Sequence, residues 1–425
     1  MNTNFIDFNE KIPVKEKYEM IVCGAGVSGI AAAVAAARKG VKVLLLEKNL
    51  NLGGLATNGL INYFVPACNG RGTKIIKGMS QEFFDLSIKY GYDTIPSEWK
   101  ENSDITKDRK GQRYITKYSS NIFSLALAEL VISSKVKLLL DVDVLATIME
   151  NNHCKGVVIS GKDGRYFYPA DYVVDTTGDA DILHQAGVPC IDGKNYFTYC
   201  TYKADVDSCK KVAETGNIKN LYVRAYGGSI DLYGNNQPDD VPLYKGTSIE
   251  DVTEFILKNQ QILFDKIKNE DRNSRDIVIT PSQAQFRTTR CIKGEHIFSE
   301  KDTFLHFEDS IGAICDFDRR DYLYEVPYRC LVNKGFDNLI TAGRSASASG
   351  YGWDVLRVIP PAIITGQAAG TAVSIAIKSK SNINNIDIRL LQNELEKDNV
   401  MIHFDDNLIP KDKSKIGEKV ESDHI

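Results

Sequence analysis

The feature that most constrains this chain is the order of segments between residues 18 and 47. A buried apolar run, YEMIVC, covers residues 18–23 and predicts a parallel strand. It leads directly into the glycine turn 24–29 (GAGVSG) and then into the small-residue helix IAAAVAAARKG, which ends at Gly40. The next apolar run, VKVLLLE, predicts a second strand that ends on Glu47. A strand, glycine turn, helix and strand ending in an acid together predict a unit that binds a dinucleotide.

Each residue type in this unit has a physical reason. Gly24 permits a tight turn, and Gly26 lets the backbone approach a pyrophosphate where a side chain would collide. Gly29 lets the helix pack closely on the sheet. The helix N-terminus offers unpaired N–H groups and a positive dipole end to the phosphates. Glu47 stands where a carboxylate can accept hydrogen bonds from both ribose hydroxyls.

Composition excludes several classes of protein. A net charge of −4 and a pI near 6.0 give no reason to expect nucleic acid or an anionic membrane as partner. The N-terminus has no signal-peptide pattern, and the longest apolar stretch, near residues 30–37, is too short to span a bilayer. Nine scattered cysteines without a CxxC pair argue against disulfides and metal clusters. We therefore expect a cytoplasmic protein with a small-molecule substrate.

Nucleotide-type segments at both ends of the chain predict a discontinuous α/β fold. We expect a Rossmann-like dinucleotide-binding domain with an inserted, sheet-rich α+β substrate domain, and a cleft for ligands at their junction. The predicted parts are 18–60, 115–190 and 331–380 for the dinucleotide-binding domain, 61–114 for a helical and loop excursion, 191–330 for the substrate (cap) domain, and 381–425 for a C-terminal helix and tail.

Local patterns predict further elements of secondary structure. A single strand is expected over 136–150, a hairpin turn at 162–164, and a glycine-rich loop over 346–357 that could cap an active site. The expected helices cover 75–90, 119–134, 247–269, 355–380 and 386–398. Residues 92–113 are expected to form a polar surface excursion, and 411–425 a frayed charged tail.

Later motifs distinguish a flavin from a nicotinamide cofactor. After the first unit come, in order, GGLATNG, DYVVDTTGDAD, FRTTRCIKGEH, VPYRCL and NLITAGRSASASGYGWDVLRVIPPAIITGQAAG. With the first unit they resemble the glutathione-reductase-like class of FAD proteins. More narrowly, they resemble the FAD-dependent oxidoreductase family that carries a C-terminal AGR…GQAAG segment. The resemblance covers residues 20–370 and implies that the cofactor is FAD.

The resemblance also implies a set of cofactor contacts. Those at the pyrophosphate are Gly24, Gly26, Val27, Ser28 and Gly29; those near the adenosine are Glu47, Lys48, Thr177, Gly178 and the backbone of Val144; those along the ribityl chain are Gly54, Leu55, Ala56 and Thr57; and those near the isoalloxazine are Gly343, Arg344, Arg357 and Val358.

The last small-residue helix admits two interpretations. Its N-terminus would face the flavin and stabilise the negative charge of the reduced ring. Alternatively, the small residues of GQAAG simply let two helices pack closely. The stretch 53–70 contains no histidine, which predicts that FAD is bound non-covalently. The sequence also contains no second GxGxxG motif, so we expect no built-in NAD(P)H domain.

The four candidates for catalysis are Arg290, His296, Tyr328 and Asp354. Arg287 and Arg290 flank the threonines of a predicted strand and so would face opposite ways; Arg290 is the candidate for the cleft, with a structural ion pair as the alternative. His296 would be a base or a hydrogen-bonded structural histidine. Tyr328 and Arg329 would alternate on a strand, so that either could reach the substrate side of the flavin.

One acid is the fourth candidate, and two further acids are expected to have another role. Asp354 would be a base or a helix N-cap. Asp179 and Asp181, at a strand end beside the cofactor, are expected to bind backbone N–H groups rather than to catalyse.

The resulting hypothesis is an FAD-dependent oxidoreductase that acts on a small polar organic substrate by hydride transfer to or from non-covalently bound flavin. Two alternatives stay open: a flavin-binding protein with a lyase, isomerase or biosynthetic role, and an electron-transfer flavoprotein subunit of a larger complex. In the oxidoreductase hypothesis the second electron acceptor or donor is external to the chain and its identity is open.

Overall fold

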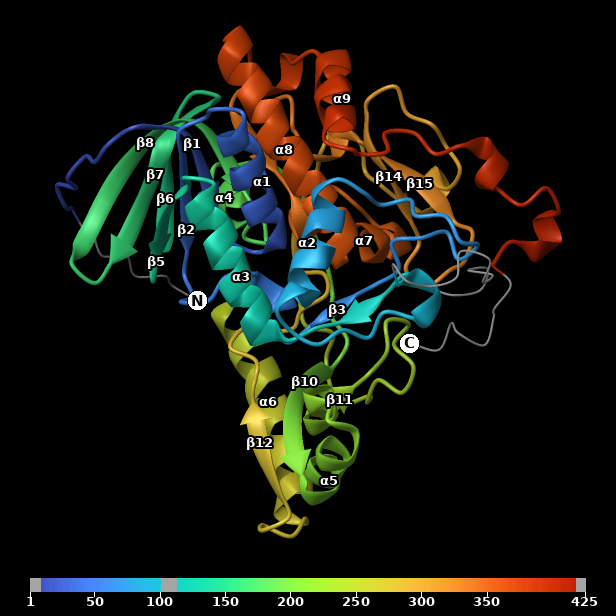
Figure 1. Ribbon diagram of the computed structural model, residues 1–425. Coiled ribbons are helices and arrows are strands. Elements are labelled where there is room, and N and C mark those ends of the chain that lie inside the picture. The colour runs from blue at the N-terminus through green and yellow to red at the C-terminus, as the bar shows by residue number, and fades with distance from the viewer. Residues whose placement is uncertain (1–8, 101–112, 418–425) are drawn as a thin grey trace.

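The computed structural model describes residues 9–100 and 113–417. A seven-stranded sheet forms its centre, in the order β5-β2-β1-β8-β7-β6 with β16 joined to β8 (Figure 1). The strands are β1 (Tyr18–Cys23), β2 (Val43–Glu47), β5 (Lys137–Leu140), β6 (Asp143–Glu150), β7 (His153–Gly161), β8 (Gly164–Asp175) and β16 (Leu339–Thr341). The predicted strands over 18–23 and up to Glu47 are therefore confirmed.

The sheet combines a parallel and an antiparallel part. β5, β2, β1, β16 and the second half of β8 are parallel, whereas β6, β7 and the first half of β8 form an antiparallel meander. The hairpin turn predicted at 162–164 joins β7 to β8. The single strand predicted over 136–150 is wrong, because Asp141 has a φ of 58° and the chain turns there from the parallel part into the meander.

Alternate strand residues face two different cores. Met20, Val22 and Leu45 pack toward α1 (Val27–Arg38) and α8 (Ile359–Ser379). Ile21 and Leu44 face the other side, where α4 (Asp181–Gln185) packs. The strands are therefore covered on both faces. Because β1, β2 and the second half of β8 are parallel, their carboxyl ends lie at one edge of the sheet.

Helices α1 and α8 touch through small residues. A Cβ at Gly366 would lie 2.2 Å from the carbonyl oxygen of Ser28, and one at Gly370 would lie 2.1 Å from that of Ala32. These glycines are therefore required for close packing, as the packing interpretation of GQAAG predicted. The contact also ties the N-terminal turn of α1 to the C-terminal part of the chain.

The loop predicted over 346–357 is wrong over most of its length. Helix α7 (Gly350–Arg357) forms there because Trp353, Val355 and Leu356 give it a buried face. It meets α8 at a bend of 78°. Pro360 and Pro361 lie in the first turn of α8, where the missing N–H groups would have no helical partner.

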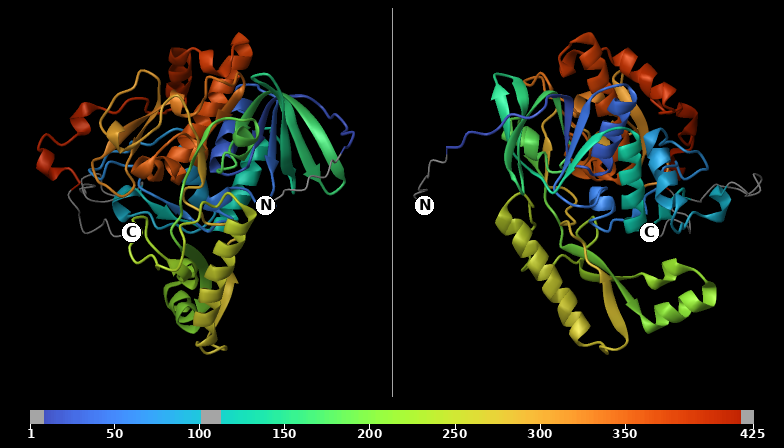
Figure 2. Two further views of the ribbon diagram at one scale, coloured as in Figure 1. Left: turned by 180° about the vertical axis from the view of Figure 1, so that it is seen from behind. Right: turned by 60° about the vertical axis from the view of Figure 1, so that its left-hand side comes forward.

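A second, smaller sheet lies in a lobe that projects away from the first (Figures 1 and 2). Its order is β11-β10-β12. The lobe contains β10 (Thr198–Asp205), β11 (Val223–Ser229), β12 (Arg275–Ile279), α5 (Val206–Thr215) and α6 (Ile249–Lys268). The later part of the range 191–330 lies outside this lobe. It contains β14 (Ser310–Cys315) and β15 (Leu323–Pro327), and β14 contacts both α8 and α9 (Ile388–Lys397).

The remaining elements are short or peripheral. They are α2 (Met79–Lys89), α3 (Ser120–Ser133), β3 (Tyr63–Phe64), β4 (Thr116–Lys117), β9 (Cys190–Asp192) and β13 (Arg290–Ile292). Helix α2 begins later than predicted, because Gly78 before it has a φ of 62°. Parts of the predicted surface excursion and frayed tail, 101–112 and 418–425, lie outside the described residues. In the described part, no single helix is both long and apolar enough to cross a bilayer; the bent pair α7–α8 has the length and composition.

Candidate cofactor site

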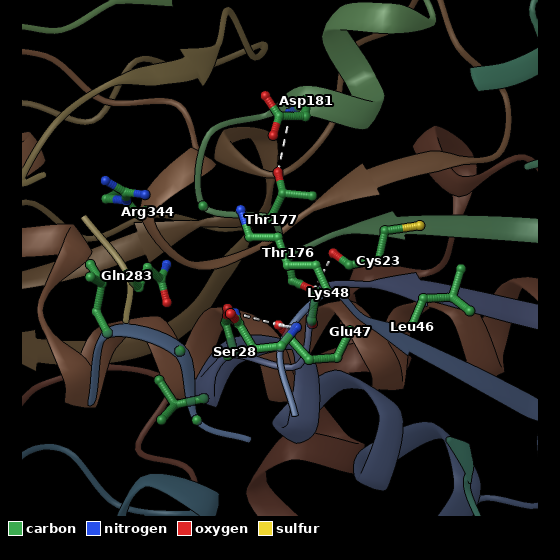
Figure 3. Close-up of a pocket in the computed structure, with 18 of the residues that line it drawn as sticks. Cys23, Ser28, Leu46, Glu47, Lys48, Thr176, Thr177, Asp181, Gln283 and Arg344 are labelled. Carbon is green, nitrogen blue, oxygen red and sulfur yellow. Dashed lines mark hydrogen bonds between the residues drawn. The ribbon is translucent and has the colours of Figure 1, made fainter. Parts of the chain in front are cut away.

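An open cleft lies at the carboxyl ends of β1, β2 and β8, the edge where ligands bind in such sheets (Figure 3). Its empty volume is about 1190 Å³, which includes space open to solvent. The cleft is lined by many of the residues that the resemblance implied: Gly24, Gly26, Val27, Ser28, Glu47, Lys48, Gly54, Leu55, Ala56, Val144, Thr177, Gly178, Arg344 and Arg357.

Gly26 is the position where the protein leaves room that its own structure does not need. Its backbone has a φ of −66° and a ψ of 175°, which any residue can adopt. A Cβ added there would meet no atom within 4 Å and would enter the cleft. Glycine at this position is explained by neither strain nor packing, so the geometry fits a ligand that approaches the backbone closely.

The other glycines of the turn are structural. Gly24 has a φ of 103°, and a Cβ on Gly29 would lie 1.9 Å from the carbonyl oxygen of Gly24. The first backbone bond of α1 runs from the N–H of Ile30 to the carbonyl of Gly26 at 3.0 Å. The N–H groups of residues 27–29 therefore have no partner within the helix, which suits an anion such as a diphosphate.

Glu47 is buried, and protein donors fix the position of its carboxylate. Oε2 accepts a hydrogen bond from the backbone N–H of Ala25 at 2.7 Å. Oε1 accepts from the backbone and side-chain N–H groups of Asn49, each at 2.8 Å. A carboxylate has about four acceptor positions, so these three donors leave room for a hydroxyl from the cleft.

Four residues of the implied set do not line the cleft: Gly29, Thr57, Gly343 and Val358. The hydroxyl of Thr57 donates to the carbonyl of Leu52 at 2.5 Å and so closes its own loop. A Cβ on Gly343 would lie 2.5 Å from Oγ of Ser28. In this structure Gly29, Thr57 and Gly343 shape the neighbouring backbone.

The loop after β8 is organised by a residue that the sequence analysis did not single out. Asp175 is fully buried and accepts hydrogen bonds from the N–H and hydroxyl of Thr177 and from the N–H groups of Ile182 and Leu183. Burial raises the pKa of Asp175 to about 6, against the lowering effect of these donors. Its place at the strand end, before Thr176, Thr177 and Gly178 of the cleft wall, was the available signal.

The role predicted for Asp179 and Asp181 is wrong. Their carboxylates bind arginines rather than backbone N–H groups: Asp179 pairs with Arg344 at 2.6 Å and Asp181 with Arg290 at 2.7 Å. Arg290 also donates to the backbone carbonyl of Asp179 at 2.9 Å and does not line the cleft. The structure thus gives Arg290 the ion pair that was its alternative interpretation.

Arg344 joins three parts of the chain. It donates to the carbonyl of Phe286 at 2.7 Å as well as to Asp179, and its own carbonyl accepts from the indole N–H of Trp353 at 2.8 Å. The side chain is largely buried at the cleft wall. It therefore links the loop after β8, the segment leading to β13 and helix α7.

The other candidates for catalysis do not line the cleft. Nε2 of His296 lies 3.0 Å from Oδ2 of Asp302, the hydrogen-bonded arrangement that was its alternative. Residues 328–330 form a single turn of 3₁₀-helix, so the predicted alternation of Tyr328 and Arg329 on a strand is wrong. The hydroxyl of Tyr328 donates to the carbonyl of Ile383 at 2.8 Å, and burial raises the pKa of this phenol.

Asp354 is inside α7, and the N-cap of that helix is Ser349, so the N-cap interpretation is wrong. Its Oδ1 accepts from Nε and Nη2 of Arg357 at 2.9 and 2.6 Å. Arg357 lines the cleft, as the resemblance implied. Gln283, Ile359 and Ala362 also line it, and the sequence analysis missed these three residues.

A second arginine lies near Arg357. Nη1 and Nη2 of Arg287 donate to the carbonyls of Asp231 and Ile230, each at 2.9 Å. Burial and the positive charge of Arg357 lower the pKa of Arg287 to about 10. Arg287 does not itself line the cleft, and the charges of Asp354 and Asp231 act on it as well as that of Arg357.

Comparison with known proteins gives one family and several solved structures. The family model described as FAD dependent oxidoreductase matches residues 19–243 and 235–395. A geranylgeranyl bacteriochlorophyll reductase-like protein from Thermoplasma acidophilum is 15% identical, with a TM-score of 0.45 over 90% of this chain and 83% of that one. A p-nitrophenol 4-monooxygenase from Pseudomonas putida is 13% identical, with a TM-score of 0.48 over 93% and 91%. An L-proline dehydrogenase from P. horikoshii is 14% identical, with a TM-score of 0.39 over 92% and 100%.

Proposed function

This chain belongs to the FAD dependent oxidoreductase family, and we propose that it oxidises or reduces a small polar, anionic organic molecule with non-covalently bound FAD. It is an enzyme whose cofactor is FAD. The finer assignment, to the glutathione-reductase-like class with its C-terminal AGR…GQAAG segment, is part of the proposal. The observation that carries the proposed FAD-dependent function is the uncovered Cα of Gly26, which faces the cleft beside the N–H groups at the start of α1 that have no partner within the helix.

We assign the cofactor positions along the cleft as follows. The N–H groups of Val27 and Ser28 would bind the diphosphate, and Glu47 would accept a hydrogen bond from the adenosine ribose. The backbone of Val144 would border the adenine, and residues 54–56 would follow the ribityl chain. The flavin ring lies between Arg344, Arg357 and the start of α8, and supplies hydride transfer when bound.

Non-covalent attachment is supported by what lines the cleft. Within residues 9–100 and 113–417, its lining holds no histidine and a single thiol, Cys23. Burial raises the pKa of Cys23 well above its ordinary range, so this thiol is a poor nucleophile. No disulfide joins the cysteines of the described residues, which supports the further proposal that the protein works in a reducing compartment such as the cytoplasm.

Helix α8 acts on the flavin end mainly through its dipole. Pro360 and Pro361 remove two of the N–H groups that a helix N-terminus normally offers. The peptide dipoles of the following turns keep their direction, and their positive end favours negative charge near Ile359. This part of the chain therefore stabilises an anion without a full set of amide hydrogen bonds.

The anionic substrate class follows from the two arginines at this end. Asp354 is the carboxylate that holds Arg357, while Arg287 is bound by neutral carbonyls. The charges of Asp354 and Asp231 also act on Arg287, so the proposal depends on the guanidinium of Arg357 at the cleft wall, which can bind a substrate carboxylate, with Arg287 as a second positive charge nearby. We propose that the lobe of β10–β12, with the segment 283–290, covers the substrate; residues 18–60, 115–190 and 331–380 remain the proposed FAD-binding domain.

Anaerobic reduction of the bound flavin tests the function. A panel of small carboxylates is compared with the corresponding amides, and loss of visible flavin absorbance is recorded. We expect bleaching by one or more carboxylates, no bleaching by the amides, and loss of the preference in Arg287→Met. Turnover that leaves the flavin spectrum unchanged would instead support a non-redox role, and bleaching only by a co-purified protein would support an electron-transfer subunit.

A further inference from the structure

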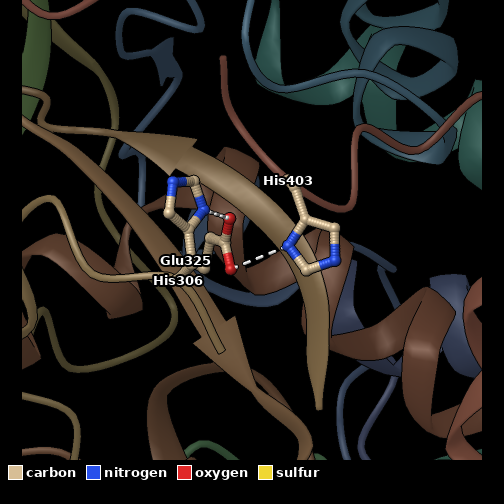
Figure 4. Close-up of side chains that lie close together, drawn as sticks. All are labelled: His306, Glu325 and His403. Atoms are coloured by element: carbon tan, nitrogen blue, oxygen red, sulfur yellow. Dashed lines mark hydrogen bonds and ion pairs between the residues drawn. The ribbon is translucent and has the colours of Figure 1, made fainter. Parts of the chain in front are cut away.

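A cluster of two histidines and a glutamate lies apart from the cofactor cleft and shares no residue with its lining (Figure 4). Nδ1 of His306 lies 2.6 Å from Oε1 of Glu325, and Nδ1 of His403 lies 3.0 Å from Oε2. The glutamate comes from β15, and the histidines come from the segment before β14 and from the segment after α9. Three distant parts of the sequence thus bring their side chains to one point.

Glu325 is an unusual carboxylate for its position. Its side chain is fully buried, and no lysine or arginine among the described residues forms an ion pair with it. Its remaining partner is the N–H of Phe307, which donates to Oε2 at 2.8 Å. A buried carboxylate is compensated by hydrogen-bond donors, by protonation or by a cation. At Glu325 the two imidazole nitrogens are placed to hold a cation together with the carboxylate.

His306 is arranged as metal-binding histidines commonly are. Its Nε2 lies 3.0 Å from Oδ1 of Asp406. Donation of the Nε2 proton to this carboxylate leaves a lone pair on Nδ1, the atom that faces Glu325. A ligating histidine almost always gives its other N–H to a carboxylate, a carbonyl or water in this way.

We propose that His306, Glu325 and His403 bind a divalent transition-metal ion of the Zn²⁺ type through Nδ1, a carboxylate oxygen and Nδ1. One ligand atom from each lies within 4.8 Å of the others, so small rotations bring all three to one ion. Two imidazoles favour zinc and its neighbours over magnesium or calcium, which prefer oxygen ligands. Water completes the coordination at the fourth position.

The ion would fasten the segment after α9 to the β14–β15 hairpin. That segment already contacts β14, because its Met401 carbonyl accepts from the N–H of Ala313 and its Ile402 carbonyl accepts from the hydroxyl of Ser310, both at 2.6 Å. The ring of His306 stacks on Phe404 at 4.4 Å between centroids. A metal at this point would act as a structural cross-link between residues distant in sequence.

Hydrogen bonding without metal is the competing explanation. The carboxylates of Asp406 and Glu325 raise the pKa of His306, so a protonated imidazole could supply the compensating charge. The two explanations differ in what happens when Nδ1 of His306, the atom that faces Glu325, loses its proton. Zinc releases it at neutral pH and holds the cluster together, whereas a hydrogen-bonded cluster loosens when His306 loses its proton.

Zinc binding to the full-length protein, stripped with EDTA and dialysed against Zn²⁺, tests the proposal. We expect one zinc per chain and loss of more than about 100-fold in affinity for His403→Ala, since removal of an outer partner alone costs about 10–100-fold. Asp406→Asn should fall within that smaller range. His296→Ala is the matched control, because it removes an imidazole that faces one carboxylate, Asp302, and should leave zinc affinity unchanged.

Two further readouts separate a specific site from surface binding. X-ray absorption at the zinc edge should show N and O ligands at about 2.0–2.1 Å with two imidazoles. Zinc should raise the unfolding midpoint of the wild type but not of His403→Ala, whose half-exposed side chain can be removed even if Glu325→Gln fails to fold. Equal zinc affinity in the wild type and His403→Ala would overturn the proposal, as would a zinc-edge spectrum without imidazole ligands.

Discussion

The carboxylate of Glu47 accepts a hydrogen bond from the backbone N–H of Ala25 at 2.7 Å, and so joins the end of β2 to the glycine turn that follows β1. This contact orients the acid at the cleft edge before any ligand is present. It also means that Glu47 has two roles, one in holding the turn and one in binding the cofactor. Substitutions at this residue must separate the two.

Glu47→Gln should weaken FAD binding by about 10–100-fold, or roughly 1.4–2.8 kcal/mol. The amide keeps one oxygen to accept from Ala25 but loses the second acceptor and the charge. Glu47→Ala leaves buried N–H groups of Ala25 and Asn49 without partners, which costs a further ~1–3 kcal/mol of apoprotein stability. Flavin titration and denaturant unfolding of the apoprotein measure the two effects. Equal losses of stability and affinity in Glu47→Gln would contradict the assigned role.

Gly26→Val should fold but fail to retain flavin. A Cβ at this position would meet no protein atom within 4 Å, so we expect a loss of at least ~100-fold in FAD affinity (about 2.8 kcal/mol) with little change in apoprotein stability. Gly29→Val is the contrasting variant, because its Cβ would collide with the Gly24 carbonyl and should destabilise the fold itself. A Gly26→Val protein that purifies fully loaded with FAD would refute the placement of the diphosphate.

Much of this site could be predicted because its signals are local. The order of strand, glycine turn, helix and Glu47 depends on residues close in sequence, and the structure brings these residues to one edge of the sheet. The positions of Arg290, His296 and Tyr328 depended instead on which distant carboxylate or carbonyl each meets, namely Asp181, Asp302 and Ile383. Sequence patterns carry no such information. Although two prolines follow Val358, the pattern also did not reveal the sharp bend between α7 and α8.

Asp175→Asn should change how stability depends on pH. Folding raises the pKa of this buried acid from 3.8 to about 6, so the folded state binds its proton more tightly than the unfolded chain. The contribution of Asp175 to stability should therefore fall as pH rises through this window and stay low above it. Apoprotein unfolding across that range should show the wild-type free energy declining relative to Asp175→Asn. A constant difference, or one that grows with pH, would mean that Asp175 is ionised throughout.

Arg344→Met should destabilise the protein more than the paired change does. The single variant leaves Asp179 without its cation and the Phe286 carbonyl without a donor, which costs about 3–5 kcal/mol by analogy with other broken buried pairs. Adding Asp179→Asn removes the unpaired charge and should restore part of the loss. Unfolding of both single variants and the double variant gives the coupling. Strict additivity would show that the ion pair contributes nothing to joining the loop after β8 with the segment near β13.

A crystal structure of the protein grown with FAD tests the central claim most directly. The account predicts a diphosphate within hydrogen-bonding distance of the N–H groups of Val27 and Ser28, packed on the bare Cα of Gly26, with the adenosine ribose on Glu47 and the flavin ring between Arg344 and Arg357. Density for the dinucleotide elsewhere on the molecule, with this cleft filled by the protein's own side chains, would contradict it.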